Sequence, residues 1–246
     1  MADEASELMR LLWGPHPQPK RGPKPALTLA GIARAGIEIA DAEGLAALSM
    51  QRVAELLGKT KMSLYRYVPG RAELVALMVE AAITAPPEAT GVVAAAEGDW
   101  RARLTTWSHS LVEVFVGHPW LLDATVGPRL MGPKELAWME QALAALDGTG
   151  LTGAERMDAV VLLTSHVRGI ALQARAATPS SGPEGRLLAA LGEVLREHGE
   201  HYPALLAATT SAAEPGAQDQ ALAFGLARIL DGLGALIAER AESPAA

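Results

Sequence analysis

Cysteine is absent from this 246-residue chain, and aromatic residues make up only 4% of it. Without cysteine the chain has no disulfide framework and no thiolate ligands for a metal. No stretch approaches the ~18 uninterrupted apolar residues of a membrane-spanning helix, and the acidic N-terminus lacks the basic region of a secretory signal. These absences predict a soluble, cytoplasmic protein with no metal site and no cofactor.

Alanine and leucine are abundant, whereas the residues that favour strands are sparse. This composition favours helix along almost the whole chain, and no convincing strand or internal repeat is visible. The length allows one large core or two domains of unequal size. We therefore expect an all-α protein.

Apolar periodicity and capping residues predict ten helices between residues 28 and 239. They run from Thr28 to Gly44, Ser49 to Gly58, Lys61 to Tyr67, Arg71 to Thr84, Asp99 to Val116, Trp120 to Val126, Pro133 to Leu146, Ala154 to Ala176, Glu184 to His198 and Asp219 to Glu239. The Pro- and Gly-rich stretch GPHPQPKRGPKPA opposes helix before them. The predicted organisation is a flexible basic arm (1–27), a small helical head (28–84) and a larger helical body (97–241).

Charge is distributed unevenly along the chain. Residues 20–71 hold nine basic and four acidic residues, a net charge of +5, which leaves −12 for the remainder of a chain whose total is −7. A basic head on an acidic body favours contact between the head and a polyanion. A solvated surface with chance clustering explains the charge pattern alone equally well.

The spacing of small and large residues in the head is that of a helix-turn-helix. Ala54 lies four residues before Gly58, and Leu64 lies six residues after it. The small alanine allows two helices to approach closely, the glycine allows a left-handed turn, and Leu64 attaches the second helix to the core. Val53, Leu56 and Leu57 are expected to face inward with Leu64. The opposite face then shows Lys61, Met62, Ser63, Tyr65 and Arg66, side chains suited to phosphates and base edges.

The segments EGLAALSMQRVAELLG and MSLYRYVPGRAELV make residues 28–84 resemble the DNA-binding domain of the TetR family of bacterial transcription regulators. The rest of the chain is similar to that family only in being a helical body of suitable length. The resemblance implies a homodimer, a double-stranded DNA operator with inverted half-sites, and a pocket in the body whose small-molecule ligand releases the DNA. Lys59 departs from the small apolar residue that usually follows the turn glycine.

The resemblance also implies which residues contact DNA. These are Gln51, Arg52, Lys59, Lys61, Ser63, Tyr65, Arg66, Tyr67 and Arg71. For Tyr65 and Tyr67 the alternative is packing on the core of the head. For the arm residues Lys20, Arg21 and Lys24, entry into the minor groove and a solubilising tail remain equal alternatives.

The body holds most of the large side chains, which suit an apolar ligand pocket and an ordinary core alike. His166 and Arg168 interrupt an apolar helix, so burial would require a partner for them, either a ligand or a nearby carboxylate. The candidate ligand-binding residues are Trp107, Phe115, Trp120, Met131, Trp138, Met139, His166 and Arg168.

The two longest apolar helices, 154–176 and 219–239, are the candidate dimer interface. The resemblance implies this, because the last two long helices of the family form a four-helix bundle across the dimer axis. The alternative is that both helices are buried within one subunit.

Together these observations predict a ligand-responsive DNA-binding regulator, a repressor that a small, largely apolar molecule releases from its operator. An activator or a ligand-independent regulator with the same head is the alternative. A helical enzyme is less favoured, because no Ser/His/Asp set, carboxylate pair, phosphate loop or metal-ligand spacing stands out.

Overall fold

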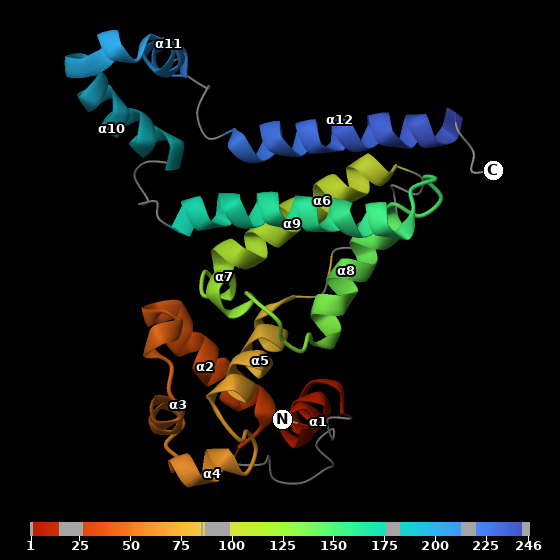
Figure 1. The fold of residues 1–246 in the computed structure, drawn as a ribbon. Helices are drawn as coiled ribbons and strands as arrows, with labels where there is room; N and C mark the ends of the chain where they lie inside the picture. Colours follow the sequence, from red (N-terminus) through yellow and green to blue (C-terminus); the bar gives the residue numbers. More distant parts are fainter. Residues whose placement is uncertain are drawn as a thin grey trace. The chain divides into compact units, whose positions relative to one another are not determined.

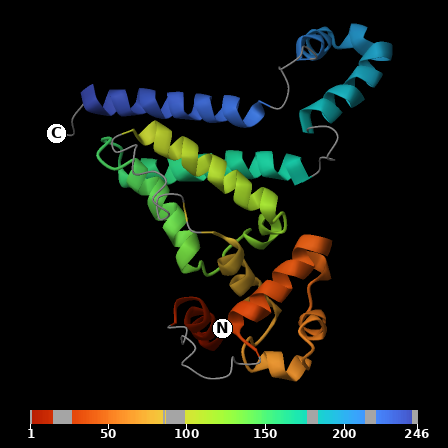
Figure 2. The ribbon, with the colours of Figure 1, turned by 180° about the vertical axis from the view of Figure 1, so that it is seen from behind.

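The structure is a computed structural model that describes residues 2–14, 27–84, 86, 99–175, 183–212 and 220–242. Every regular element in these ranges is a helix (Figures 1 and 2), which confirms the predicted all-α class. The chain divides into two compact units, Met1–Leu146 and Asp147–Ala246. Helices α6 to α8, which the sequence assigns to the body, therefore belong to the same compact unit as the head.

The first unit begins with the helices of the head. They are α1 (Ala2–Trp13), α2 (Leu29–Glu43), the short 3-10 helix η1 (Leu45–Ala47), α3 (Met50–Leu56), α4 (Lys61–Tyr65) and α5 (Arg71–Ala82). α2 packs against α5, and the side chains of Ile32, Leu74 and Met78 are completely buried. The predicted helices of the head are confirmed, with α4 and α5 each two residues shorter than expected.

Hydroxyl side chains begin three of these helices. Thr28, Ser49 and Thr60 accept hydrogen bonds from the backbone N–H groups of Gly31, Arg52 and Ser63. Each bond satisfies a donor that the first helical turn leaves without a partner. The helix starts were therefore predictable from residue type alone.

α1 lies within residues 1–27, where the sequence predicts a flexible arm. Its twelve residues precede the Pro- and Gly-rich stretch, and Leu12 is buried while α1 packs against α5. The prolines from which the sequence analysis predicted a flexible arm come after this helix, so they do not oppose its formation. The predicted arm residues Lys20, Arg21 and Lys24 lie outside the described residues.

The first unit continues with α6 (Trp100–Gly117), α7 (Leu121–Ala124) and α8 (Pro133–Ala145). α6 packs against α8, and the rings of Trp107 and Trp138 meet edge to face with centroids 5.9 Å apart. The indole N–H of Trp107 donates to the backbone oxygen of Trp138 at 2.9 Å. The indole N–H of Trp138 donates to the backbone oxygen of Thr84 at 2.9 Å, so both buried indoles have an acceptor.

The second unit contains α9 (Gly153–Arg175), α10 (Pro183–His198), the 3-10 helix η3 (Gly199–His201), α11 (Pro203–Ala212) and α12 (Ala221–Glu242). α9 packs against α12, and Leu163 of α9 is buried, as are Leu226 and Leu230 of α12. Arg240 of α12 forms an ion pair with Glu155 of α9. α11 was not predicted, because Pro203 was not interpreted as a helix start.

Candidate nucleic-acid interface

The turn between α3 and α4 has the geometry that the glycine and alanine spacing predicts. Gly58 has a φ of 62°, a backbone conformation that L side chains rarely adopt. The N–H of Lys59 donates to the oxygen of Ala54 at 2.8 Å, which closes the end of α3. Ala54 and Leu64 are both 0% exposed. The helix-turn-helix is thus present, and Lys59 is accommodated in it without losing the turn.

One inward residue was predicted wrongly. Leu56 was expected to face the core beside Val53 and Leu57, yet 49% of it is exposed and Leu57 is only half-buried. α3 is seven residues long, and its core-facing side is formed by Met50, Val53 and Ala54. The apolar character of Leu56 was therefore a poor guide to its orientation.

The outward face of α4 gathers four of the predicted DNA contacts. Lys61, Tyr65 and Arg66 are exposed, as is Tyr67 just beyond the helix, and the Lys61 ammonium lies 5.5 Å from the centre of the Tyr65 ring. Within the described residues, neither Lys61 nor Arg66 forms an ion pair with a carboxylate. These two cations are therefore available to an external anion. The exposure of Tyr65 and Tyr67 argues against core packing for both rings.

Ser63 and Lys59 complete the same surface less directly. The Ser63 hydroxyl donates to the backbone oxygen of Thr60 at 2.6 Å, so it forms part of the N-terminal cap of α4. Its oxygen keeps a lone pair free for a further donor. Lys59 is exposed within the turn, and its ammonium lies on a flexible stem.

Three predicted contacts instead have partners inside the head. Arg52 forms an ion pair with Glu43 and donates to the oxygen of Ala47 at 3.2 Å. The hydrogen bond between the two side chains holds the pKa of Glu43 below its usual value and raises the pKa of Arg52. Gln51 donates to the Glu55 carboxylate at 2.7 Å.

Arg71 is the third such residue. Its guanidinium donates to the backbone oxygens of Leu48 at 3.1 Å and Leu45 at 2.8 Å. Arg71 therefore attaches the start of α5 to η1 and to Leu48, the residue that follows η1. The sequence motif identified Arg71, but nothing in the sequence indicated that its partners are carbonyls 23 and 26 residues away.

A groove of about 300 Å³ lies beside Arg52, between α2 and α3. Its lining residues are Glu38, Ile39, Ala42, Glu43, Arg52, Glu55 and Leu56. Three carboxylates against one paired arginine make this side unfavourable for phosphate groups. The cationic side of the head is therefore the α4 face and not this groove.

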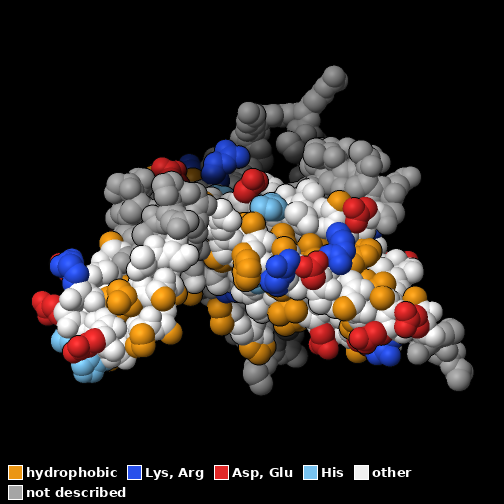
Figure 3. All heavy atoms as spheres, turned by 90° about the horizontal axis from the view of Figure 1, so that it is seen from above, with side chains coloured by type: hydrophobic (Ala, Val, Ile, Leu, Met, Phe, Trp, Pro, Cys, Tyr) orange, Lys and Arg blue, Asp and Glu red, His pale blue; other side chains and the backbone are white. Residues whose placement is uncertain are grey.

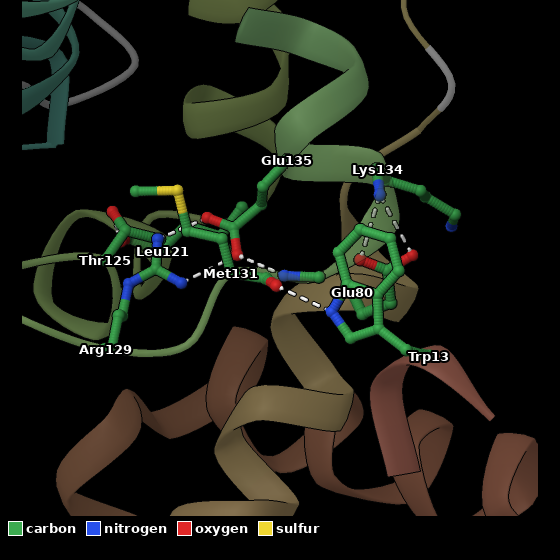
Figure 4. A network of polar contacts seen from close by, with 9 residues as sticks. Trp13, Glu80, Leu121, Thr125, Arg129, Met131, Lys134 and Glu135 are labelled. Atoms are coloured by element: carbon green, nitrogen blue, oxygen red, sulfur yellow. Dashed lines mark hydrogen bonds and ion pairs between the residues drawn. The ribbon is translucent and has the colours of Figure 1, made fainter. Parts of the chain in front are cut away.

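Polar contacts also join the head to α6, α7 and α8 within the first unit. One Asp41 carboxylate oxygen accepts from His118 Nδ1 at 2.8 Å and from the Trp120 indole at 2.7 Å. The Glu80 carboxylate accepts the backbone N–H of Lys134 at 3.2 Å (Figure 4). These pairs were not predicted, because the two partners of each lie 54 to 79 residues apart along the chain.

The six candidate ligand residues of the first unit differ in how far their side chains are buried. Trp107, Phe115, Trp120 and Trp138 are buried, and all three indoles donate hydrogen bonds to protein oxygens. Met131 is 37% exposed and Met139 is half-buried. The described contacts of the tryptophans are those of a core.

The other two candidates, His166 and Arg168, belong to the second unit and are half-buried on α9. His166 Nε2 lies 3.2 Å from the backbone oxygen of Leu222 on α12. The polar ring therefore has a protein partner of the kind that its burial requires. Among the described residues, no three His, Asp or Glu side chains are placed to hold a metal ion.

Comparison with known proteins agrees with this architecture. Residues 94–237 match the family model described as the tetracyclin repressor-like C-terminal domain. The HTH-type transcriptional repressor DrrR1 of Streptomyces coeruleorubidus is 36% identical over 243 residues, which cover 96% of this chain and 88% of DrrR1.

Solved structures give the same result. Apo ActR from Streptomyces coelicolor superposes with a TM-score of 0.71 and 26% identity, over 88% of this chain and 99% of ActR. ActR in complex with actinorhodin superposes with a TM-score of 0.69 and 27% identity, over 86% of this chain and 98% of that one. The helix-turn-helix head, the all-helical body and these likenesses agree, and the chain belongs to the TetR family of DNA-binding transcription regulators.

Proposed function

We propose that this regulator is a repressor that binds an inverted-repeat operator as a homodimer and leaves it when a small, largely apolar molecule binds the body. The observation that carries the DNA-binding part is the outward face of α4. Lys61, Tyr65 and Arg66 are exposed there together, and both cations lack a carboxylate partner within the described residues. Such a face suits a helix that enters the major groove.

Roles within this surface follow from the side-chain chemistry. Lys61, Arg66 and Lys59 are assigned to phosphates, because each can bring a positive charge to the backbone of the duplex. The hydroxyls of Ser63, Tyr65 and Tyr67 can each donate or accept at a phosphate or a base edge. Their contacts give register and part of the sequence preference.

Gln51, Arg52 and Arg71 have a second role in this proposal. Each is hydrogen-bonded within the head, so each would reach DNA only by sharing or exchanging its present partner. We assign Arg52 and Arg71 mainly to the placement of α3 and α5, from which α4 is presented.

The dimer contact is proposed on α9 and α12. α12 is long and apolar enough, by length and composition, to span a membrane. Only 17% of its most apolar 18-residue stretch is buried within one copy of the chain, so most of this apolar surface is left uncovered. α9 exposes Met157, Val161, Leu162 and Leu172. Seen from above, the described surface shows hydrophobic side chains between scattered charged ones (Figure 3). We assign this surface to a second copy of the chain, because exposed apolar side chains gathered on one surface mark interaction sites.

Ligand response is proposed from the relatives and from the body. The solved ActR complex contains actinorhodin, and DrrR1 is named a repressor. The body of this chain is rich in apolar side chains, so an apolar effector suits it best. A regulator of this kind needs no catalytic centre, and its place is the cytoplasm, where the DNA is.

The test is selection of random duplex DNA on the purified protein, followed by sequencing. An enriched inverted repeat supports a sequence-specific dimer and supplies the operator. Salt-sensitive binding without enrichment would overturn the proposed operator recognition. Actinorhodin, the ligand of the ActR complex, is then the first probe for release, with the isolated duplex as a control for direct binding of the compound to DNA.

A further inference from the structure

α5 is held at both ends. At its N-terminus, Arg71 donates to the backbone oxygens of Leu45 and Leu48, just before α3 begins. Between the ends, Leu74 and Met78 are completely buried in the head. Twelve residues at a rise of ~1.5 Å each make this helix roughly 18 Å long. α5 therefore connects the start of the helix-turn-helix with whatever holds its far end.

The far end is held by α8. Both carboxylate oxygens of Glu80 lie 3.2 Å from the backbone nitrogen of Lys134, and the Trp138 indole donates to the backbone oxygen of Thr84 at 2.9 Å. Lys134 lies in the first turn of α8, where an N–H has no acceptor within its own helix. Pro133 before it has no N–H at all. Glu80 thus supplies a negative charge from another helix to the positive end of α8.

Gly132 leaves the space that this contact needs. A Cβ atom at Gly132 would lie 2.1 Å from Glu80 Oε2 and 2.9 Å from Glu80 Cδ. Its φ of −83° and ψ of 172° are accessible to alanine. The three atoms nearest to such a Cβ all belong to the Glu80 side chain, so a methyl group at this position would displace the Glu80 carboxylate.

Two further contacts surround the same junction (Figure 4). Trp13 of α1 donates its indole N–H to the backbone oxygen of Met131 at 3.1 Å, directly before Gly132. Arg129 forms an ion pair with Glu135 in the first turn of α8, and both side chains are largely buried. The loop that leads into α8 is therefore fixed independently of Glu80, and it presents the Lys134 N–H to it.

We propose that Glu80 is a positioning residue that couples α8 to the DNA-reading helix through α5. A shift of α8 that removes the Lys134 N–H from Glu80 releases the far end of α5, and α5 carries the Arg71 anchor of the helix-turn-helix. By linkage, DNA that fixes the head favours the arrangement in which the bond to Lys134 is made. This inference rests on the proposed function, because it assumes that the head binds an operator.

Lysine is rare enough to make the test specific. The chain has five lysines, of which Lys59 and Lys61 lie in the helix-turn-helix and Lys134 starts α8. In protein that contains 15N-labelled lysine, the NMR signals of the Lys59 and Lys61 amides report DNA binding at the head. The signal of Lys134 reports the bond to Glu80, and Lys134→Arg assigns it.

The experiment measures hydrogen exchange at the Lys134 amide with and without the selected operator duplex. We expect the operator to slow this exchange roughly fivefold in the wild type, which is the effect of a capping bond. Glu80→Ala and Gly132→Ala should abolish the slowing, whereas Glu80→Gln, which keeps an acceptor oxygen, should retain part of it. Glu140→Ala, which removes an exposed carboxylate of α8, should retain all of it.

A purely structural role for Glu80 would lower the thermal stability of the variants but leave the DNA-dependent slowing intact, and that result would overturn the inference. The inference would also be overturned if, in the wild type, the operator changed the Lys59 and Lys61 signals but left hydrogen exchange at the Lys134 amide unchanged. If no duplex moves the Lys59 and Lys61 signals, the proposed function itself fails and the coupling fails with it. Gly132→Ala keeps the test decisive if Glu80→Ala does not fold.

Discussion

Replacement of Lys61 by alanine should change the salt dependence of operator binding more distinctly than it changes the fold. Lys61 is exposed on α4 and has no carboxylate partner among the described residues. Its only described interaction is the contact of its ammonium with the Tyr65 ring at 5.5 Å. Loss of an exposed contact of this kind costs the head at most ~1 kcal/mol.

The magnitude follows from counterion release. Each phosphate contact contributes about 0.9 to the slope of log K against log salt, so the loss of one Lys61 in each half-site lowers the slope by about 1.8. Between about 50 and about 200 mM salt, the wild type should therefore lose about tenfold more affinity than Lys61→Ala does. At low salt the variant should bind more weakly than the wild type on every sequence, because a phosphate contact does not distinguish bases.

The assay is fluorescence anisotropy with the selected duplex over a series of salt concentrations, together with thermal unfolding of each protein. Arg196→Ala is the matched control, since it removes one exposed positive charge from α10 and should leave the slope unchanged. An unaltered slope for Lys61→Ala, with the fold intact, would refute the assignment of Lys61 to a phosphate. Equal slope changes in both variants would show that only net charge matters.

Three further outcomes test the core, the dimer and an ion pair. Leu64→Ala should lower the free energy of unfolding by about 2–5 kcal/mol, because this leucine is 0% exposed in the head, and chemical denaturation measures it. Val161→Glu should turn the proposed dimer into monomers in light scattering, whereas Val194→Glu, at a similarly exposed position of α10, should not. The hydrogen bond from Arg240, followed by those from the backbone N–H and the hydroxyl of Thr152, lowers the pKa of Glu155 to about 2, so these contacts stabilise the fold above pH ~4.5 and lose their effect as the pH falls towards 2. The difference in thermal stability between the wild type and Glu155→Gln should shrink over that range, and a difference that is constant with pH would contradict this account.

The sequence predicted what depends on neighbouring residues. Thr28, Ser49 and Thr60 were identifiable as helix starts, since a hydroxyl before an apolar repeat needs only a donor three residues away. The spacing of Ala54, Gly58 and Leu64 identified the turn for a similar reason. All these interactions close within a few residues, so residue type and spacing were sufficient.

Distant partners could not be predicted in this way. Arg71 was recognised from its motif, yet its hydrogen bonds go to carbonyls of η1 and Leu48, which any residue type can offer. Glu80 was not selected at all, because its partner is a backbone N–H 54 residues along the chain. α1 was missed for a related reason, as its docking on α5 is a tertiary contact and no motif marks it.

The shortness of α4 makes its position depend on contacts made elsewhere in the head. A helix of five residues has almost no stability of its own in water, because helix nucleation is unfavourable and too few backbone hydrogen bonds form to offset it. Its position is set instead by the burial of Leu64 and by the turn that joins it to α3. α3 in turn begins beside the carbonyls that Arg71 holds. If α4 reads the operator as proposed, we therefore expect its affinity for DNA to depend on how α5 is placed, so that substitutions at the far end of α5 change it without touching the duplex.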